Sequence, residues 1–275
     1  METDRILTLY FLRHQESVQN KYGFGKADTH LTEQGRERVS NLSRLVSAIG
    51  VGNIDHILTG TLQRHHQTLG GLLERIGYHG EIIPDERLNA LFSGPLLELP
   101  AAETERRYQL DRFRTGSDGL CAVELPEGRT IHFDPAKEGI YPFDPLYCGA
   151  YFDKGLRQAV FPHEPTLPSF HAIAKQARNL QGDIIRRANE SPKPLHIVAI
   201  SSCSPSGFNL EYATFGTVGK NMRTPFGSEG NPVFPQNHDE LMVLGYTRDD
   251  ASSGRKRLRA IEGNVNIDSY IKRLT

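Results

Sequence analysis

"ILTLYFLRHQES", residues 6–17, places an arginine-histidine pair directly after a run of mostly apolar residues. A continuous apolar run of this length, without alternation, is typical of a strand that is buried on both faces of a sheet. We therefore expect a strand over residues 6–12, with Arg13 and His14 at its end. Ligands of open α/β sheets bind beyond the carboxyl ends of the strands, so this pair marks a candidate functional site.

The rest of the chain alternates between helical and strand patterns. Apolar residues at spacings of three and four predict a helix over residues 33–49, with Thr32 as its N-cap and Gly50 as its end. This alternation predicts an α/β fold, a three-layer α/β/α sandwich with a mostly parallel sheet. Further strands are expected at 54–58, 81–83, 195–200 and 240–246, and further helices before Gly77, after the cap Ser169, and at Ser204-Pro205, with Ser204 as N-cap.

The stretch 93–168 differs in character, because it is rich in proline, glycine, aspartate and aromatic residues. It carries only a short helical pattern, near residues 101–112. Loops of this length inside a compact domain are usually functional lids or insertions. We therefore expect one domain over residues 1–275, with an insertion at 93–168 that covers the pocket. The mixed charges of residues 248–259 predict a solvated face or a frayed end.

Composition narrows the class of partner. The chain has 275 residues with a net charge of -1, so it lacks the basic footprint of a protein that binds nucleic acid or an acidic membrane surface. Three scattered cysteines form no disulfide framework, which favours a reducing compartment. The sequence shows neither a signal peptide nor a membrane span. We expect a cytoplasmic protein that acts on a small molecule, and the oligomeric state stays open.

Three motifs in the first 70 residues occur in a fixed order. The first is Arg-His-x-Glu-Ser followed by Asn, the second is Leu-Thr-x-x-Gly, and the third is Leu-x-Arg-x-x-Gln-Thr. Together they resemble the histidine phosphatase superfamily, in its phosphoglycerate-mutase-like branch, with a glutamine at the usual glycine of the first motif. The matching residues are Arg13, His14, Gln15 (for glycine), Glu16, Ser17 and Asn20; Leu31, Thr32 and Gly35; and Leu62, Arg64, Gln67 and Thr68.

The resemblance implies phosphoryl transfer through a phosphohistidine at His14, without a metal or another cofactor. A histidine at a strand end can offer one ring nitrogen while the other is tied to the backbone. Arg13 and Arg64 would form the clamp on the phosphate oxygens, since guanidinium groups bind them in bidentate fashion. The substrate-binding residues would be Asn20, Ser17 and Ser202, although Asn20 and Ser17 also suit a local turn cap.

Two positions depart from the family pattern. The general acid of the family falls on Ala90, and its second histidine falls on Ser202. A general acid contributes about 10²–10⁴-fold and one preorganised donor roughly 10²–10³-fold, so the loss restricts turnover to substrates with good leaving groups. Serines that open a helix can bind an anion without a histidine. Candidate replacement acids are Glu98, Glu103 and His238.

Three functions remain open at this point. The first is a divergent phosphohydrolase that acts on a small phosphorylated or otherwise anionic metabolite. The second is a repurposed enzyme of the same fold, in which His14 is an acid or base on a substrate without phosphate. The third is a pseudoenzyme that binds a phosphorylated ligand without turnover. His30, His65 and His66 are not expected to bind metal, because adjacent helix residues point to different sides.

Overall fold

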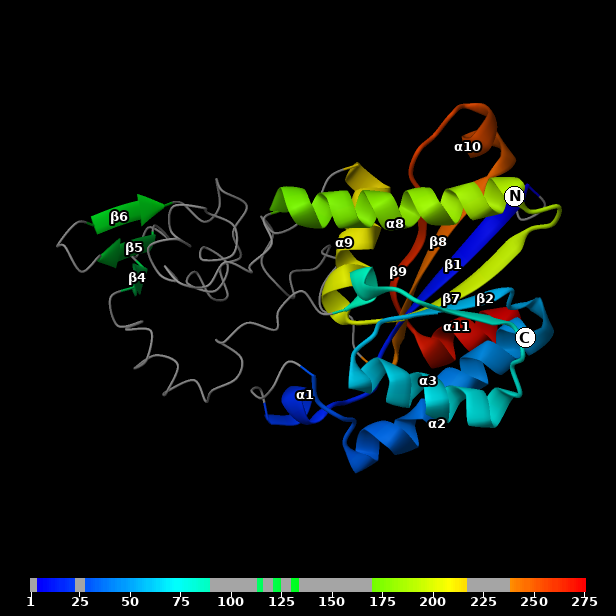
Figure 1. The fold of residues 1–275 in the computed structure, drawn as a ribbon, viewed down its shortest axis with the longest axis horizontal. Helices are drawn as coiled ribbons and strands as arrows, with labels where there is room; N and C mark the ends of the chain where they lie inside the picture. The colour runs from blue at the N-terminus through cyan, green and yellow to red at the C-terminus, as the bar shows by residue number, and fades with distance from the viewer. Residues whose placement is uncertain are drawn as a thin grey trace.

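The computed structural model describes residues 4–22, 28–89, 113–115, 121–124, 130–133, 170–216 and 238–275. A six-stranded sheet in the order β3-β2-β7-β1-β8-β9 lies between two layers of helices (Figure 1). The first four of these strands are parallel to one another. Strand β8 is antiparallel to β1, and β9 is antiparallel to β8. The strands are β1 (Arg5–Arg13), β2 (His56–Thr59), β3 (Glu81–Pro84), β7 (Leu195–Ser201), β8 (Glu240–Thr247) and β9 (Arg259–Asn266).

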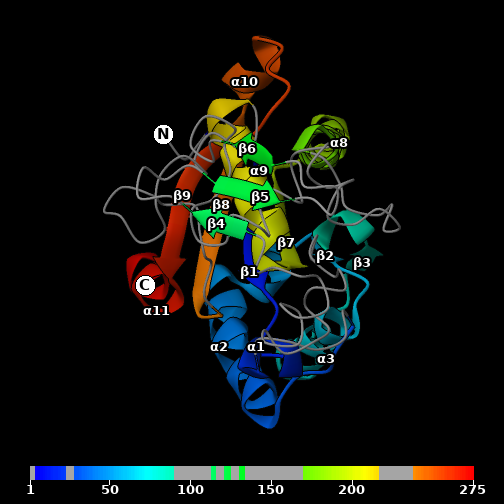
Figure 2. The same cartoon turned by 90° about the vertical axis from the view of Figure 1, so that its left-hand side faces the viewer.

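Helices cover both faces of this sheet, as Figures 1 and 2 show. One face carries α2 (Glu33–Ile49), α3 (Gln63–Ile76) and α11 (Ile267–Leu274). The other face carries α8 (Phe170–Glu190) and α9 (Cys203–Phe215). The predicted three-layer sandwich with a mostly parallel sheet is therefore confirmed. Shorter elements are α1 (Val18–Tyr22), α10 (Arg248–Ser252) and the 3₁₀ turns η1 (Val51–Asn53) and η2 (Glu86–Leu88).

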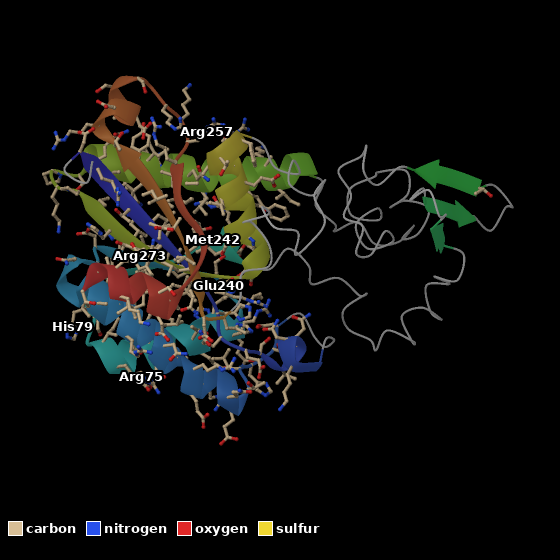
Figure 3. The ribbon with its side chains drawn as sticks, turned by 180° about the vertical axis from the view of Figure 1, so that it is seen from behind. Arg75, His79, Glu240, Met242, Arg257 and Arg273 are labelled. Atoms are coloured by element: carbon tan, nitrogen blue, oxygen red, sulfur yellow. The ribbon has the colours of Figure 1, made fainter. Side chains whose placement is uncertain are left out.

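The central strand β1 is buried on both sides, as its unbroken apolar run predicts. Leu9 and Phe11 are fully buried in the cluster that includes Leu180 of α8. Tyr10 and Leu12 point the other way, into the cluster that includes α2 and α3. In Figure 3 Met242 of β8 lies within the sheet, and it belongs to the first of these clusters. The strand that carries Arg13 is thus fixed by apolar packing on both faces.

Helix α2 begins and ends where the sequence predicts. The Thr32 hydroxyl accepts a hydrogen bond from Gly35 N at 2.9 Å, which is an N-cap interaction. Gly50 ends the helix with a positive φ of 92°. Gly35 also has a packing role, because a Cβ at this position would overlap the carbonyl oxygen of Glu16. The glycine of the motif Leu-Thr-x-x-Gly therefore lets the start of α2 pack closely against the loop that follows His14.

A second, smaller sheet falls within residues 93–168. It consists of β4 (Phe113–Thr115), β5 (Cys121–Glu124) and β6 (Thr130–Phe133), paired antiparallel in that order. These strands are not predicted from the sequence, because three or four residues are too few for a clear alternation of side chains. The helical pattern near residues 101–112 lies outside the described residues.

Two details of the C-terminal half differ from the expectation. Helix α9 has Ser202 rather than Ser204 as its N-cap residue. Residues 248–259 form a largely solvated face, as one of the two alternatives predicts, but they are not a frayed end, because they contain α10 and a fully buried Asp250. Thr247 and Arg259 satisfy this carboxylate, and β9 and α11 follow. Buried charges persist when they are paired, so charge content alone misled the prediction. No helix among the described residues is long and apolar enough to cross a membrane.

Candidate active site

Three neighbouring parallel strands end side by side at the same edge of the sheet. His14 N donates a hydrogen bond to Ser201 O at 2.8 Å, which extends the β1–β7 ladder beyond Arg13. Gly60 N donates to Ile200 O at 3.0 Å, which extends the β2–β7 ladder in the same way. The residues after β1, β2 and β7 therefore meet, as the topology predicts.

His14 lies directly after β1 and is only 3% exposed. Its Nδ1 lies 2.8 Å from the carbonyl oxygen of Gln15, which can only accept, so Nδ1 carries the proton and Nε2 the lone pair. Burial lowers the pKa of His14 well below its ordinary value, and the neighbouring His65, Arg64 and Arg13 lower it further. The ring is therefore neutral near pH 7, with Nε2 as its nucleophilic or basic atom.

The two predicted arginines come from different elements. Arg13 is the last residue of β1, and Arg64 is the second residue of α3. Arg64 is only 2% exposed, although its guanidinium is always charged. The charges of Arg64 and Arg13 both lower the pKa of His14. The end of β1 and the start of α3 thus bring the imidazole and the two predicted arginines to this edge of the sheet.

His65 is a member of the site that the sequence analysis left out. Its side chain is fully buried, and its ring lies edge-on to that of His14 at 5.2 Å between centroids. His65 Nε2 lies 3.0 Å from Ser202 Oγ. Burial, with the charge of Arg64, lowers the pKa of His65 to about 3. The available signal was its position next to Arg64 at the start of a helix, whereas its neighbour His66 is exposed.

His238 lies on the other side of His14, with 6.0 Å between the ring centroids. Its Nδ1 donates to the carbonyl oxygen of His14 at 2.8 Å. Burial and the charge of Arg13 lower its pKa to about 4, so it is neutral near pH 7 and has no proton on Nε2 to give. No group of three or more His, Cys, Asp or Glu side chains in the described part of the chain could hold a metal ion.

The substitution of glutamine for the usual glycine has a visible consequence at position 15. The Gln15 side chain is fully buried, and its Nε2 donates to the carbonyl oxygen of His238 at 3.0 Å. Its backbone N donates to the hydroxyl of Thr68 at 3.1 Å. The same hydroxyl donates to Arg64 O at 2.8 Å. Gln15 and Thr68 thereby tie together the segments that carry His14, Arg64 and His238.

The accessory residues differ in their surroundings. Ser17 donates to Asn20 Oδ1 from its backbone N at 3.2 Å and from its hydroxyl at 2.9 Å, so these two residues cap a local turn. Asn20 is exposed, and its amide nitrogen is the group that could donate to an anion. Ser202 is buried beside His65. The remaining positions, Ala90, Glu98 and Glu103, lie outside the described residues.

The fold is that of the phosphoglycerate-mutase-like class of α/β proteins. Residues 9–130 match the family described as histidine phosphatase superfamily (branch 1), which covers the three motifs and confirms the resemblance. The chain thus has a histidine phosphatase fold. No curated protein sequence matches it.

Solved structures agree on the fold at low sequence identity. A phosphoglycerate mutase from Bacillus anthracis has a TM-score of 0.58 at 12% identity and covers 100% of this chain and 99% of its own. The alpha-ribazole phosphatase from Shigella flexneri has a TM-score of 0.57 at 16% identity, covering 94% and 96%. A mycobacterial glucosyl-3-phosphoglycerate phosphatase has a TM-score of 0.56 at 17% identity, covering 94% and 99%.

Proposed function

We propose that this protein is a phosphohydrolase that removes the phosphoryl group of a small phosphorylated metabolite through a phosphohistidine at His14. The observation that carries the proposal is the state of the His14 ring. The ring is neutral, its Nδ1–H donates a hydrogen bond to Gln15 O, and its Nε2 keeps a lone pair. The named activities of the structural neighbours, which include two phosphatases of small phosphorylated compounds, support the same class of reaction.

In the proposed reaction His14 Nε2 attacks phosphorus, and the bond from phosphorus to the leaving oxygen breaks. Arg13 and Arg64 stabilise the charge on the equatorial phosphoryl oxygens. Asn20 donates from its amide nitrogen to the same group, Ser17 holds Asn20 in place, and Ser202 lies beside His65 at the same edge of the sheet. Water then attacks phosphorus and releases inorganic phosphate. The protein would carry out this reaction in the cytoplasm without a metal.

The nature of the leaving group follows from the acid position. Alanine at residue 90 cannot protonate a departing alkoxide, and His238 is neutral near pH 7, while the other candidate acids, Glu98 and Glu103, lie outside the described residues. An aryl or acyl phosphate needs little protonation, because its leaving group is a weak base. We therefore assign the protein to substrates of that kind, with an expected advantage over alkyl phosphates of about 10²–10⁴-fold, the range of a general acid.

Steady-state phosphate release tests this proposal. We expect 4-nitrophenyl phosphate to be hydrolysed, glycerol phosphate to be a much poorer substrate, and His14→Ala to abolish both activities. His79→Ala is the matched control, because His79 is exposed and lies at the outer edge of the molecule in Figure 3. Saturable binding of phosphate without release by the wild type would instead show a pseudoenzyme. His14-dependent conversion of an unphosphorylated compound would show a repurposed enzyme.

A further inference from the structure

The strand-to-helix junction after β7 carries a serine whose hydroxyl is not used as a helix cap. Ser202 precedes α9 (Cys203–Phe215) as its N-cap residue, but its side chain caps no backbone N–H group of that helix. The hydroxyl oxygen instead lies 3.0 Å from His65 Nε2. The hydroxyl of an N-cap serine usually accepts a hydrogen bond from a backbone N–H of the helix, whereas this hydroxyl contacts an imidazole.

The imidazole at this junction keeps a lone pair that can accept a proton. His65 is fully buried, and burial keeps it neutral near pH 7, so one ring nitrogen carries a proton and the other a lone pair. The group beside Nδ1 decides which of the two ring nitrogens carries the proton. If Nδ1 carries the proton, Nε2 accepts the hydroxyl proton of Ser202.

Asn89 favours that arrangement. A Cβ built on Gly60 would contact both His65 Nδ1 and, at 2.8 Å, Asn89 Oδ1, so the two atoms lie near one point. Asn89 Oδ1 is identified as the oxygen because it accepts from Thr61 N at 2.7 Å, while Nδ2 donates to the Thr61 hydroxyl at 2.8 Å. His65 Nδ1 is buried and has no hydrogen-bond partner among the described residues. Asn89 raises the pKa of His65, as a group that accepts from the ring N–H does.

We propose that Ser202 is a second nucleophile of this site, with His65 as its base and Asn89 as a positioning residue, and that it hydrolyses small carboxylic esters. A nucleophile, a base within hydrogen-bond distance and a third group that orients the base form the general signature of covalent catalysis. The place of the serine, between a central parallel strand and a helix, is also the place of the nucleophile in α/β-hydrolases. Ser202 has ordinary extended backbone angles (φ -86°, ψ 162°), so the assignment rests on its partners.

The reaction balances without any further reactant except water. Ser202 Oγ adds to the ester carbonyl carbon, and its proton moves to His65 Nε2. The bond from carbon to the alcohol oxygen then breaks, and His65 returns the proton to that oxygen. Water attacks the acyl-serine and gives a proton to His65, the carboxylic acid departs, and the proton returns to Ser202 Oγ. The nearby Arg13 and Arg64 favour esters whose acid part carries a negative charge.

Labelling with a fluorophosphonate tests the proposal, since this probe reacts covalently with serines that a base activates. We expect one label on wild-type protein, located at Ser202 by fragmentation of its peptide. Ser202→Ala is expected to remove the label, and His65→Gln to slow labelling by about 10²-fold, the low end of the range of a general base, because the lowered pKa of His65 makes it a weak one. The control is Ser43→Ala, which removes a buried hydroxyl that donates to Val39 O in α2. No label at Ser202, or equal labelling of His65→Gln and wild type, would overturn the proposal.

Asn89 needs a separate readout, because its loss could disturb the structure. We expect Asn89→Leu to slow labelling and Asn89→Asp to restore it, since a carboxylate oxygen also accepts from His65 Nδ1. Equal labelling of Asn89→Leu and wild type would remove Asn89 from the proposal. Hydrolysis of 4-nitrophenyl succinate faster than 4-nitrophenyl acetate, lost in Ser202→Ala, is the expected turnover result. These assays contain no phosphate ester, so their outcome is independent of the phosphohydrolase proposal.

Discussion

His14 owes its assigned role to the hydrogen bond at the far side of its ring. Because Nδ1 donates to Gln15 O at 2.8 Å, the lone pair is confined to Nε2. Burial and three neighbouring positive or titratable groups keep the ring from binding a second proton. A nucleophile that is neutral at every pH of interest has no need to lose a proton before it attacks. The environment of His14 therefore suits a nucleophile better than a general acid, which must carry a proton on Nε2.

The proposed clamp on the phosphoryl group depends on the charge of Arg64. Arg64→Met keeps the length of the side chain and removes its charge. We expect the kcat/KM for 4-nitrophenyl phosphate to fall by about 10²–10³-fold, which is the effect of losing one preorganised donor to a developing charge. Arg75→Met is the control, because Arg75 is exposed on the same helix (Figure 3). Equal losses in both variants, measured by steady-state kinetics, would show that Arg64 has no specific role.

Sequence reasoning reached some of these residues and missed others for a physical reason. Arg13, His14 and Arg64 stand in ordered motifs next to strand ends, so topology places them together. His65 was missed because its partner, Ser202, follows a different strand, and no spacing along α3 reports a contact across the sheet. The role of Gln15 is also visible only in the structure, because its partner, His238 O, lies far away in the sequence.

At the scale of elements, the start of α2 fixes the loop after His14. Thr32 N donates to Glu16 O at 2.9 Å, and the Thr32 hydroxyl donates to Glu16 Oε1 at 2.7 Å. Gln67 of α3 accepts from Leu31 N at 2.7 Å. The second and third motifs therefore support the segment that carries the first.

Gly35→Ala and Gly70→Ala form a matched pair that tests this support. A Cβ at Gly35 would overlap Glu16 O, whereas a Cβ at Gly70 of α3 would meet nothing within 4 Å. We expect Gly35→Ala to lower the free energy of unfolding by about 1–3 kcal/mol, as overpacking does, and to reduce phosphatase activity. Gly70→Ala should raise it by about 0.4–1 kcal/mol, because alanine favours a helix interior. Urea denaturation measures both, and a stabilised Gly35→Ala would contradict the packing argument.

Element prediction succeeded where apolar periodicity was long and failed where it was short or charged. The 17 residues of α2 and the nine of β1 carry clear patterns. The strands β4, β5 and β6 are too short for such a pattern. For the charged stretch that contains Asp250, only the frayed-end alternative is wrong, because the pairing of Asp250 with Arg259 is a contact that the sequence does not display.

At the scale of the whole molecule, three neutral histidines gathered at one edge of the sheet make stability depend on pH. Burial is the main cause of the lowered pKa values of His14, His65 and His238, and His196 shifts in the same direction. Between these pKa values and about 6.5, the unfolded chain binds protons on these residues and the folded chain does not. Their contribution to stability is therefore complete above about pH 6.5 and is lost as the pH falls.

We expect the free energy of unfolding to drop on acidification from pH 7 to pH 5, with a slope of up to about 1.4 kcal/mol per pH unit for each such histidine. Urea denaturation at pH 7, 6 and 5 measures the slope. His65→Gln should reduce it, whereas His79→Ala, an exposed site, should leave it unchanged. A free energy that stays constant over this range would contradict the burial of neutral imidazoles.

The most direct measurement is the detection of a phosphoryl group on His14 during turnover. Wild-type protein is mixed with acetyl phosphate, quenched in alkali, and digested for mass spectrometry. The predicted result is an adduct that is labile in acid, located at His14, and absent from His14→Ala. Release of phosphate with no adduct at His14, or an adduct on another residue that persists in His14→Ala, would contradict the central assignment.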